Sequence, residues 1–296
     1  MSNMLLRAFD EAARAGSIRK ASETLGVAPS SVSRSIALLE REMGTQLLAR
    51  SAAGVTLTHA GQLVADYARG VLLDYDSLRS DLDDMRGTQR RLLRLVLVES
   101  VASYGPIRAV AKFIGKYGAV SFDLRLLPAP AVIDAVINDR CDVGVAFCAD
   151  PAPELAVLAR IAEPIVLAVP AAHRGTSPVD LRSLAGWRVG VPDTSFGVRR
   201  ILDRACSREG VQISPVLSSN VFETLRDFVR CGAGAAVLPM RAVARQARAG
   251  EMQMLPFADP AFRDTTLDVI VLRKRRLPRV VRAFADILVA EISAEP

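Results

Sequence analysis

Three short helical segments separated by glycines constrain the first sixty residues more than any other feature of this chain. The first two are predicted over 5–15 and 18–25, where apolar residues recur at intervals of three and four. Gly16 and Gly26 end these segments, and Ser17 is suited to capping the second one. Two short helices joined by such a tight turn predict a helix-turn-helix.

The third segment, 29–43, has two faces of different chemistry. One face is a predicted core stripe of four apolar residues: Val32, Ile36, Leu39 and Met43. The other face carries small side chains and two guanidinium groups: Ser30, Ser33, Arg34, Ala37 and Arg41. Short side chains let a helix enter the major groove, and arginine can donate two hydrogen bonds to guanine. We therefore predict a recognition helix for double-stranded DNA, with a merely solvated polar face as the alternative.

A β-hairpin is predicted after this helix. Two short apolar arms, 47–50 and 55–58, surround a tip that contains Gly54. Arg50 stands at the base of the hairpin, where the wing of a winged helix reaches backbone phosphates. Such a contact would support affinity for DNA but not the choice of sequence.

The overall charge of +6 allows nucleic-acid binding but does not carry the prediction. Residues 1–60 hold seven basic and five acidic side chains, and residues 61–86 hold three basic and six acidic ones. The placement of individual cations on the third helix is the informative feature.

A long amphipathic stretch, 58–85, follows the hairpin. Seven apolar residues recur there in steps of three and four: Val64, Tyr67, Val71, Tyr75, Leu78, Leu82 and Met85. This spacing is typical of a coiled coil, so a second copy of the chain is the expected partner. Packing against the chain's own core is the alternative.

A single register over residues 16–61 carries a family resemblance. It comprises Gly16-Ser17-Ile18, Ala21-Ser22, the run 25–36, Leu39-Glu40, Met43-Gly44, the runs 47–50 and 54–58, and Ala60-Gly61. These residues resemble the DNA-binding module of LysR-type transcriptional regulators. Pro29 and Leu48 depart from the pattern, since the family often has a polar residue and a phenylalanine there. Because Pro29 cannot hydrogen-bond a base, more of the sequence reading would fall on Ser30, Ser33 and Arg34.

The resemblance implies a bacterial, cytoplasmic DNA-binding regulator with a dimerising linker helix. Homodimers and homotetramers are both compatible with the sequence, as are activation and repression, and the resemblance allows a contact with RNA polymerase. The residues that we predict to contact DNA are Arg19, Lys20, Ser30, Ser31, Ser33, Arg34 and Arg50.

Beyond residue 90, short apolar strands alternate with helices. The strands are predicted at 93–98, 122–127, 143–147, 165–169, 188–191, 235–238 and 267–272. Helical patterns lie between them, at 107–116, 132–138, 198–208 and 221–231 among others. This alternation predicts an α/β fold with largely parallel sheets.

In the family this part forms two lobes similar to periplasmic binding proteins. The fold class that we predict is therefore an α+β multidomain chain with a winged helix-turn-helix, a linker helix and a two-lobed α/β domain. The predicted domains are 1–58 for DNA binding, 59–90 for the linker and dimerisation helix, and 91–296 for effector binding. Lobe one comprises 91–162 and 267–296, and lobe two comprises 163–266.

Hydroxyl and amide side chains gather at three predicted junctions: after the strands 93–98 and 188–191, and at the start of the helix 221–231. Ligands of open α/β domains collect at such strand-to-helix junctions, although each junction alone is also consistent with an ordinary helix cap. We expect a small-molecule effector between the lobes, contacted by Ser100, Val101, Ser103, Phe147, Cys148, Thr194, Ser195, Phe196, Asn220 and Phe222. Its identity does not follow from these residues.

Enzyme, metal and membrane functions have little support. Known nucleophile, phosphate-loop and zinc-protease motifs are absent, and four cysteines and two histidines have no metal-ligand spacing. We expect no catalytic residues, metal or cofactor. The cysteines are expected in the core, although a redox role for Cys141 or Cys148 stays open. No apolar run is long enough for a bilayer, and Arg7, Asp10 and Glu11 argue against a secretory signal.

The alternative function is a cytosolic small-molecule binding protein, or an enzyme on a binding-protein-like scaffold. It accounts for residues 91–296 equally well. It leaves the polar face of the third helix and the wing without a purpose.

Overall fold

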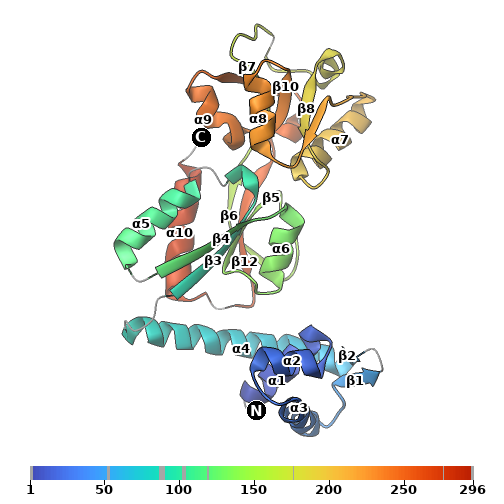
Figure 1. The fold of residues 1–296 in the computed structure, drawn as a ribbon, viewed down its shortest axis with the longest axis vertical. Helices are drawn as coiled ribbons and strands as arrows, with labels where there is room; N and C mark the ends of the chain where they lie inside the picture. The colour runs from blue at the N-terminus through green and yellow to red at the C-terminus, as the bar shows by residue number, and fades with distance from the viewer. Residues whose placement is uncertain are drawn as a thin grey trace. The chain divides into compact units, whose positions relative to one another are not determined.

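The computed structural model describes residues 3–51, 54–86, 91–101, 105–118, 120–175, 177–275 and 277–294 (Figure 1). The chain divides into two compact units, residues 1–88 with 274–278, and residues 89–273 with 279–296. Ser103 and residues 52–53 of the predicted wing tip lie outside the described residues.

The first unit is a winged helix-turn-helix followed by a long helix. Its elements are α1 (Asn3–Ala15), α2 (Ile18–Leu25), α3 (Pro29–Met43), the antiparallel pair β1 (Leu48–Ser51) and β2 (Gly54–Leu57), and α4 (His59–Arg86). The Ser17 hydroxyl accepts the N–H of Lys20 at the start of α2, and Gly26 ends that helix with a φ of 65°. The predicted bounds of α2 and α3 are confirmed: Ser17 caps the start of α2, Pro29 begins α3, and a glycine ends each helix.

A single apolar core holds this unit together. Phe9 of α1, Ile36 and Leu39 of α3 and Ala65 of α4 are fully buried in it. Met43, which the sequence placed in the same stripe, is 38% exposed. That part of the prediction is wrong because Met43 lies in the last turn of α3, beyond Leu39, the last buried residue of the helix.

The wing is attached to α3 through hydrogen bonds. Glu40 Oε1 accepts the N–H groups of Leu47 at 2.8 Å and Leu48 at 3.1 Å. Gly61, in the first turn of α4, lies so close to this strand that an added Cβ would stand 2.0 Å from the carbonyl oxygen of Leu47. The hairpin is therefore held between α3 and α4.

The predicted seam of α4 is divided between two environments. Val64 and Val71 pack against the core of the unit, so their assignment to a seam for a second copy is wrong. Tyr67, Tyr75, Leu78 and Leu82 are exposed, and the side chain of Met85 lies outside the described residues. The division arises because the first half of α4 packs on α1.

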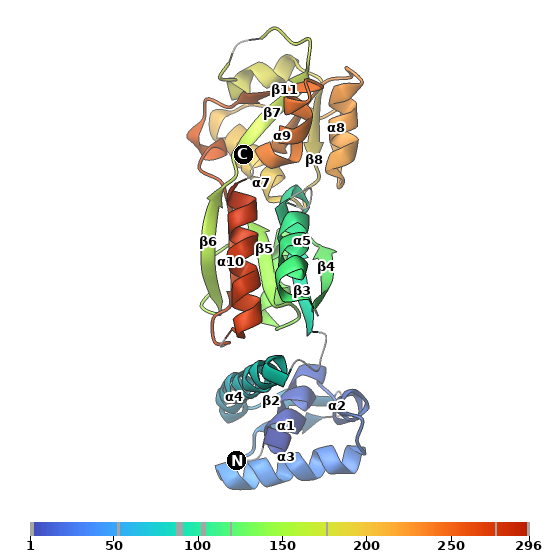
Figure 2. The same cartoon turned by 90° about the vertical axis from the view of Figure 1, so that its left-hand side faces the viewer.

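The second unit contains two five-stranded sheets, each with helices on both faces (Figures 1 and 2). Lobe one has the strand order β4-β3-β5-β12-β6. Its strands are β3 (Arg91–Leu97), β4 (Val120–Leu126), β5 (Val143–Phe147), β6 (Leu155–Ala162) and β12 (Thr266–Leu272). The helices α5 (Gly105–Tyr117) and α10 (Arg279–Ser293) lie side by side on one face, and α6 (Ala129–Ile137) covers the other. A short 3₁₀ turn, η1 (Glu99–Val101), follows β3.

Lobe two repeats this arrangement with the strand order β11-β7-β10-β8-β9. Its strands are β7 (Ile165–Pro170), β8 (Val189–Pro192), β9 (Leu217–Ser219), β10 (Ala235–Pro239) and β11 (Met252–Pro256). The helices are α7 (Gly197–Glu209), α8 (Phe222–Arg230) and α9 (Met240–Arg248), with short turns η2 (Leu181–Gly186) and η3 (Pro260–Phe262). Phe222, Leu225 and Val229 of α8 pack on Ala236 and Leu238 of β10.

The prediction of largely parallel sheets is wrong. In lobe one, β3 pairs in parallel with β4 and β5, whereas β12 pairs antiparallel with β5 and β6. Lobe two has the same division, with β8 parallel to β9 and β10, and β7 antiparallel to β10 and β11. The antiparallel strands are those next to the crossings between the lobes, where the chain leaves by β6 and returns by β12.

A buried ion pair stands where the chain crosses between the lobes. Glu163, between β6 and β7, is fully buried, and its Oε2 lies 2.6 Å from Nε of Arg241 at the start of α9. Arg241 also donates from Nη1 to the carbonyl of Ile292 in α10. The segment that returns to lobe one is bonded to the same residues, because the Thr265 hydroxyl donates to the Glu163 carbonyl.

Within the described ranges, no helix has the length and apolarity needed to cross a membrane. The same part of the chain holds no group of three or more histidine, cysteine, aspartate or glutamate side chains arranged to bind a metal ion.

Candidate DNA-reading helix and effector cleft

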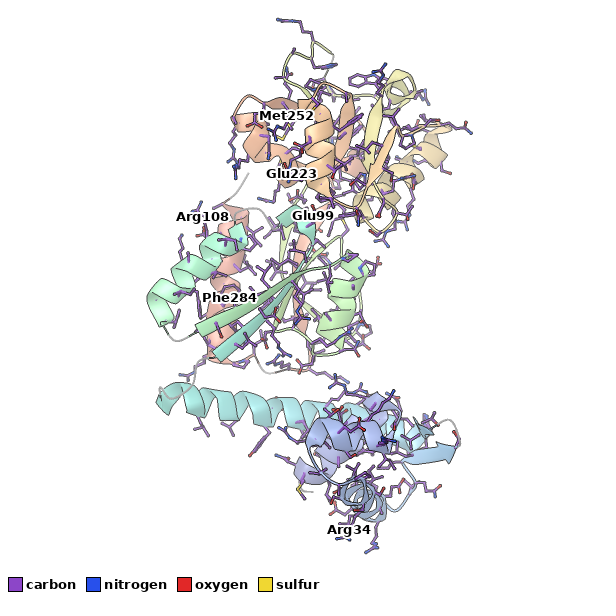
Figure 3. All side chains as sticks on the ribbon, in the orientation of Figure 1. Arg34, Glu99, Arg108, Glu223, Met252 and Phe284 are labelled. Atoms are coloured by element: carbon purple, nitrogen blue, oxygen red, sulfur yellow. The ribbon has the colours of Figure 1, made fainter. Side chains whose placement is uncertain are left out.

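The polar face of α3 is open to solvent. Ser30, Ser31 and Arg34 are exposed, Ser33 is half-buried, and the opposite stripe of the helix is buried in the core. Figure 3 shows Arg34 projecting outward from α3. Among the described residues, Arg34 makes no ion pair or side-chain hydrogen bond. Its guanidinium group is therefore available to a ligand outside the chain.

Two further predicted DNA contacts lie at the start of α2. Arg19 and Lys20 are both exposed. Arg19 pairs with Glu23 at 3.3 Å, and both side chains are largely solvated. Because such a pair adds little stability, a DNA phosphate could replace Glu23 at small cost. Arg50 lies in β1 opposite Val55, and its side chain lies outside the described residues.

A cavity of about 290 Å³ lies between the two lobes of the second unit. It is lined by strand ends and helix starts from both lobes: Val98, Glu99, Ser100, Leu126, Leu127, Pro128, Ala129, Phe147, Ser195, Phe196, Gly197, Val198, Asn220, Phe222 and Pro239. Most of these are apolar, with a few polar groups among them, as is usual in small-molecule sites.

The two lobes contribute matching junctions to this cavity. In lobe one they follow β3, β4 and β5, and in lobe two they follow β8, β9 and β10. The lobes meet closely at one of these points, because a Cβ added to Gly197 would stand 2.8 Å from the ring of Phe147. The shared sheet order therefore directs three equivalent strand ends of each lobe to one cleft.

Six of the predicted effector residues line the cavity: Ser100, Phe147, Ser195, Phe196, Asn220 and Phe222. Val101, Cys148 and Thr194 are not among the lining residues, and Ser103 is outside the described ranges. The junction 126–129 was missed, although the same strand-to-helix rule could have found it. Glu99 was also missed, since the predicted junction began one residue later, at Ser100.

Cys148 instead contacts the segment that returns from lobe two, at Thr266. It has a left-handed φ of 46°, and its thiol accepts the N–H of Thr266 at 3.4 Å. Burial raises the pKa of the Cys148 thiol above its ordinary value. A protonated thiol is a poor nucleophile, so this environment opposes redox chemistry.

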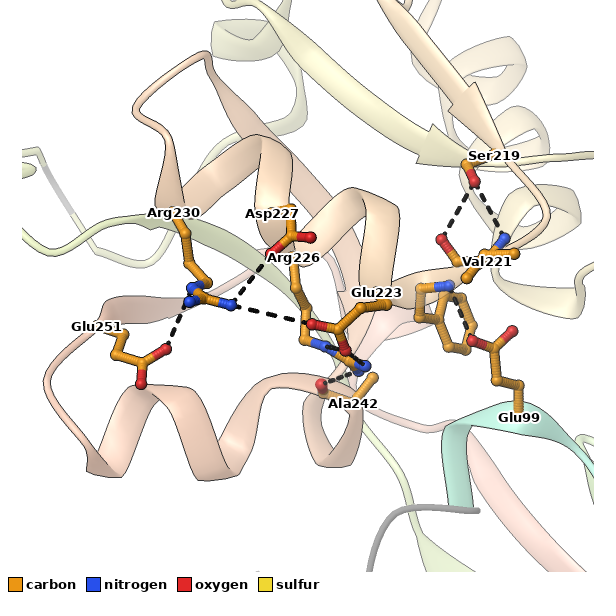
Figure 4. A network of polar contacts seen from close by, with 10 residues as sticks. Glu99, Ser219, Val221, Glu223, Arg226, Asp227, Arg230, Ala242 and Glu251 are labelled. Carbon is orange, nitrogen blue, oxygen red and sulfur yellow. Dashed lines mark hydrogen bonds and ion pairs between the residues drawn. The ribbon is translucent and has the colours of Figure 1, made fainter.

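Two polar groups of lobe one enter the cavity wall. Ser100 is 3% exposed, and its hydroxyl has no hydrogen-bond partner among the described residues. Glu99 Oε1 accepts the N–H of Phe222 at 2.9 Å, so a carboxylate of lobe one stands at the first turn of α8 in lobe two (Figure 4). Burial raises the pKa of Glu99 above its ordinary value, while the Phe222 N–H and Arg226 lower it and Glu223 raises it.

The polar side chains that lobe two contributes to the cavity differ in whether they already make hydrogen bonds. The Ser195 hydroxyl donates to Asp193 Oδ1 at 2.5 Å. The Asn220 side chain is exposed and makes no hydrogen bond to another described residue. The rings of Phe196 and Phe222 pack at 4.7 Å between centroids. The cavity thus has an aromatic wall, an unused amide and an unused buried hydroxyl.

Comparison with known proteins assigns both units to one family. Residues 4–62 match the model of the bacterial regulatory helix-turn-helix protein of the lysR family. Residues 86–293 match the model of the LysR substrate binding domain. Together the two models account for nearly the whole chain.

Relatives and solved structures agree with this assignment. The RuBisCO operon transcriptional regulator of Allochromatium vinosum is 24% identical and covers 97% of this chain and 95% of its own. The regulator GltR of Bacillus subtilis is 26% identical over 88% of this chain and 86% of its own.

Among solved structures, full-length OxyR of Pseudomonas aeruginosa has a TM-score of 0.69 at 20% identity, covering 97% of this chain and 94% of its own. Full-length CbnR in complex with its target DNA has a TM-score of 0.57 at 15% identity, covering 98% and 100%. The chain therefore belongs to the LysR family and is a DNA-binding transcriptional regulator with an effector-binding domain, not an enzyme.

Proposed function

We propose that α3 reads operator DNA through Ser30, Ser31, Ser33 and Arg34. The observation that carries the proposal is the exposed, short-chained polar face of α3 above a fully buried apolar stripe. Arg19, Lys20 and Arg50 are proposed as phosphate contacts that orient the helix on the duplex. Because operator DNA lies in the bacterial cytoplasm, the same proposal locates the protein there.

A footprint of the purified full chain on the DNA upstream of its own gene, over a range of salt concentrations, tests this proposal. We expect protection of a site with two-fold symmetry that weakens steeply with salt, because phosphate contacts release counterions. Absence of protection at low salt, both there and on genomic fragments, would contradict it. Addition of RNA polymerase to the same assay tests the contact that the family allows.

We further propose that a small-molecule effector binds in the cavity between the lobes. The apolar lining, the unused hydroxyl of Ser100 and the unused amide of Asn220 support this location. Effector binding there would alter the relative placement of the lobes and hence of subunits along a promoter.

The domain boundaries that we propose are 1–58, 59–90 and 91–296. Within the last of these, lobe one is 91–162 with 267–296, and lobe two is 163–266. Sheet membership supports this division, because β6 and β12 pair in one sheet whereas β7 and β11 pair in the other.

We propose that the second half of α4 pairs with a second copy of the chain. Tyr75, Leu78 and Leu82 recur at coiled-coil spacing and are exposed. The double substitution Leu78→Glu and Leu82→Glu is expected to shift the assembly to smaller species in light scattering, since like charges would face each other. Gln62→Glu, a single substitution that adds negative charge elsewhere on α4, serves as the control and should leave the mass unchanged.

A further inference from the structure

We propose that the effector is a small organic cation, a protonated amine on an apolar body, received by the carboxylate of Glu99. This inference rests on the proposed effector cleft and adds the chemical class of its ligand. Three features carry it: the charge of the cavity wall, the occupied N–H and guanidinium groups at the start of α8, and the aromatic lining.

Glu99 is the single charged residue among the described residues that line the cavity. Only its Oε1 is used, by the Phe222 N–H, and no described group donates to Oε2. Figure 4 shows this arrangement, with the carboxylate beside the start of α8. A carboxylate oxygen at a cavity wall makes its strongest hydrogen bond with a charged donor.

At the start of α8, the N–H that would attract an anion is already occupied. Helix α8 directs its first N–H, that of Phe222, toward the cleft, but Glu99 accepts it. The first turn of the same helix carries a second carboxylate, Glu223. An anionic ligand at this helix start would therefore meet the carboxylate of Glu99 instead of a free N–H.

Arg226 neutralises Glu223 and has no unpaired nitrogen left for an anionic ligand. Its Nε and Nη2 donate to Glu223, and its Nη1 donates to the carbonyl of Ala242 at 2.8 Å. All three nitrogens of the guanidinium group thus have partners within lobe two. Arg200 of α7 lies near Gly197 but is not a lining residue.

The remaining lining suits an ammonium ion on an apolar body. The rings of Phe147, Phe196 and Phe222 line the cavity, and aromatic faces attract cations. The buried Ser100 hydroxyl has no partner among the described residues and can accept a second N–H of the ligand. The volume of about 290 Å³ limits the ligand to a small molecule.

Matched sets of compounds test the ligand class on the full chain. Benzylamine, benzamide and benzoate form one set, and cyclohexylmethylamine, cyclohexanecarboxamide and cyclohexanecarboxylate form the other. Binding is measured by calorimetry at neutral pH for the wild type, Glu99→Gln and a control, Glu154→Gln. Glu154 is an exposed carboxylate of lobe one that does not line the cavity, so its replacement makes the same change of charge elsewhere.

We expect at least one amine to bind the wild type and Glu154→Gln, with affinity at least tenfold lower for Glu99→Gln. The matching carboxylate should bind the wild type more weakly than the amine and should gain affinity in Glu99→Gln. A glutamine at position 99 can still accept the Phe222 N–H, so the contact between the lobes is kept.

Three results would overturn the inference: a carboxylate that binds the wild type as tightly as its amine, an amine whose affinity is unchanged in Glu99→Gln, or no amine that binds. Carboxylate binding that is lost in Arg200→Gln would assign an anion to the cleft instead. Each of these outcomes leaves operator footprinting unaffected. A wrong ligand class would thus appear in calorimetry alone, whereas a wrong DNA-binding proposal would appear in the footprint.

Discussion

The DNA-reading face and the effector cleft are assembled in opposite ways. The central DNA-contacting candidates lie on one face of one helix, α3, above a stripe that is buried in the core. The cleft combines strand ends from two sheets, between Val98 and Pro239 in the chain, and Glu99 hydrogen-bonds a residue 123 positions away. Substitutions on α3 should therefore change DNA binding alone, whereas substitutions where the lobes of the second unit meet should affect both lobes.

The largest effect is expected for Arg241→Met, which tests the shared support of the two lobes. The change leaves the carboxylate of Glu163 buried without its cation, which typically costs about 3–5 kcal/mol of stability. Denaturant unfolding followed by the fluorescence of Trp187, the single tryptophan of the chain, measures it in lobe two. The double variant Arg241→Met with Glu163→Leu should recover much of the loss, because no unpaired charge remains. An equal loss in the double variant would contradict this explanation.

Leu39→Ala separates the two units. Leu39 is fully buried in the core of the first unit, and such truncations cost about 2–5 kcal/mol. We expect operator binding to be lost at lower denaturant concentration while the Trp187 transition stays in place. Leu38→Ala makes the same substitution at a 40% exposed neighbour and should change little. A matching shift of the Trp187 transition in Leu39→Ala would show that the two units unfold together.

Arg34→Ala tests the local nature of the DNA-reading face. Loss of a paired arginine contact to a base costs about 1–3 kcal/mol of discrimination, so operator affinity should fall by roughly 5- to 150-fold. Thermal unfolding and oligomer mass should not change, because Arg34 is exposed and has no partner within the described residues. Arg263→Ala removes an exposed arginine of the second unit and is the matched control. Unchanged footprints in Arg34→Ala would remove this residue from the interface.

The smallest effect concerns the pH dependence of the cleft. Burial raises the folded pKa of Glu99 above its ordinary value of 4.5, so the folded chain holds this proton more tightly than the unfolded chain. As pH rises through 4.5 and then through the folded pKa, the wild type loses stability that Glu99→Gln retains. The melting temperature of Glu99→Gln relative to the wild type should thus be higher at pH 7.5 than at pH 4. A difference that is constant with pH would contradict the shift.

Prediction from sequence succeeded where the information is local. Residues 29–43 have a 3.6-residue apolar period, a proline at the first position and a glycine after the last, and the structure has α3 over these residues. Strand β5 was predicted to the residue because its five residues are all buried and form one apolar run. β6 was missed because it is an edge strand in which exposed and buried residues do not alternate regularly.

The roles of Glu99 and Val71 could not be predicted from local sequence patterns. Val71 belongs to the coiled-coil period of α4, yet it packs on its own domain, since periodicity defines a face of a helix but not what covers it. Glu99 is one residue from a predicted contact, but its position at the start of α8 depends on how the lobes close.

The sequence by itself determined elements such as α2, α3 and β5, the winged helix-turn-helix and the family, because propensity, periodicity and capping act over a few residues. Only the tertiary structure decided the mixed strand directions, the division of the α4 seam and the carboxylate in the cleft. Those features arise from contacts between segments far apart in the chain, where the free energy of packing and ion pairing depends on distances that no local pattern contains.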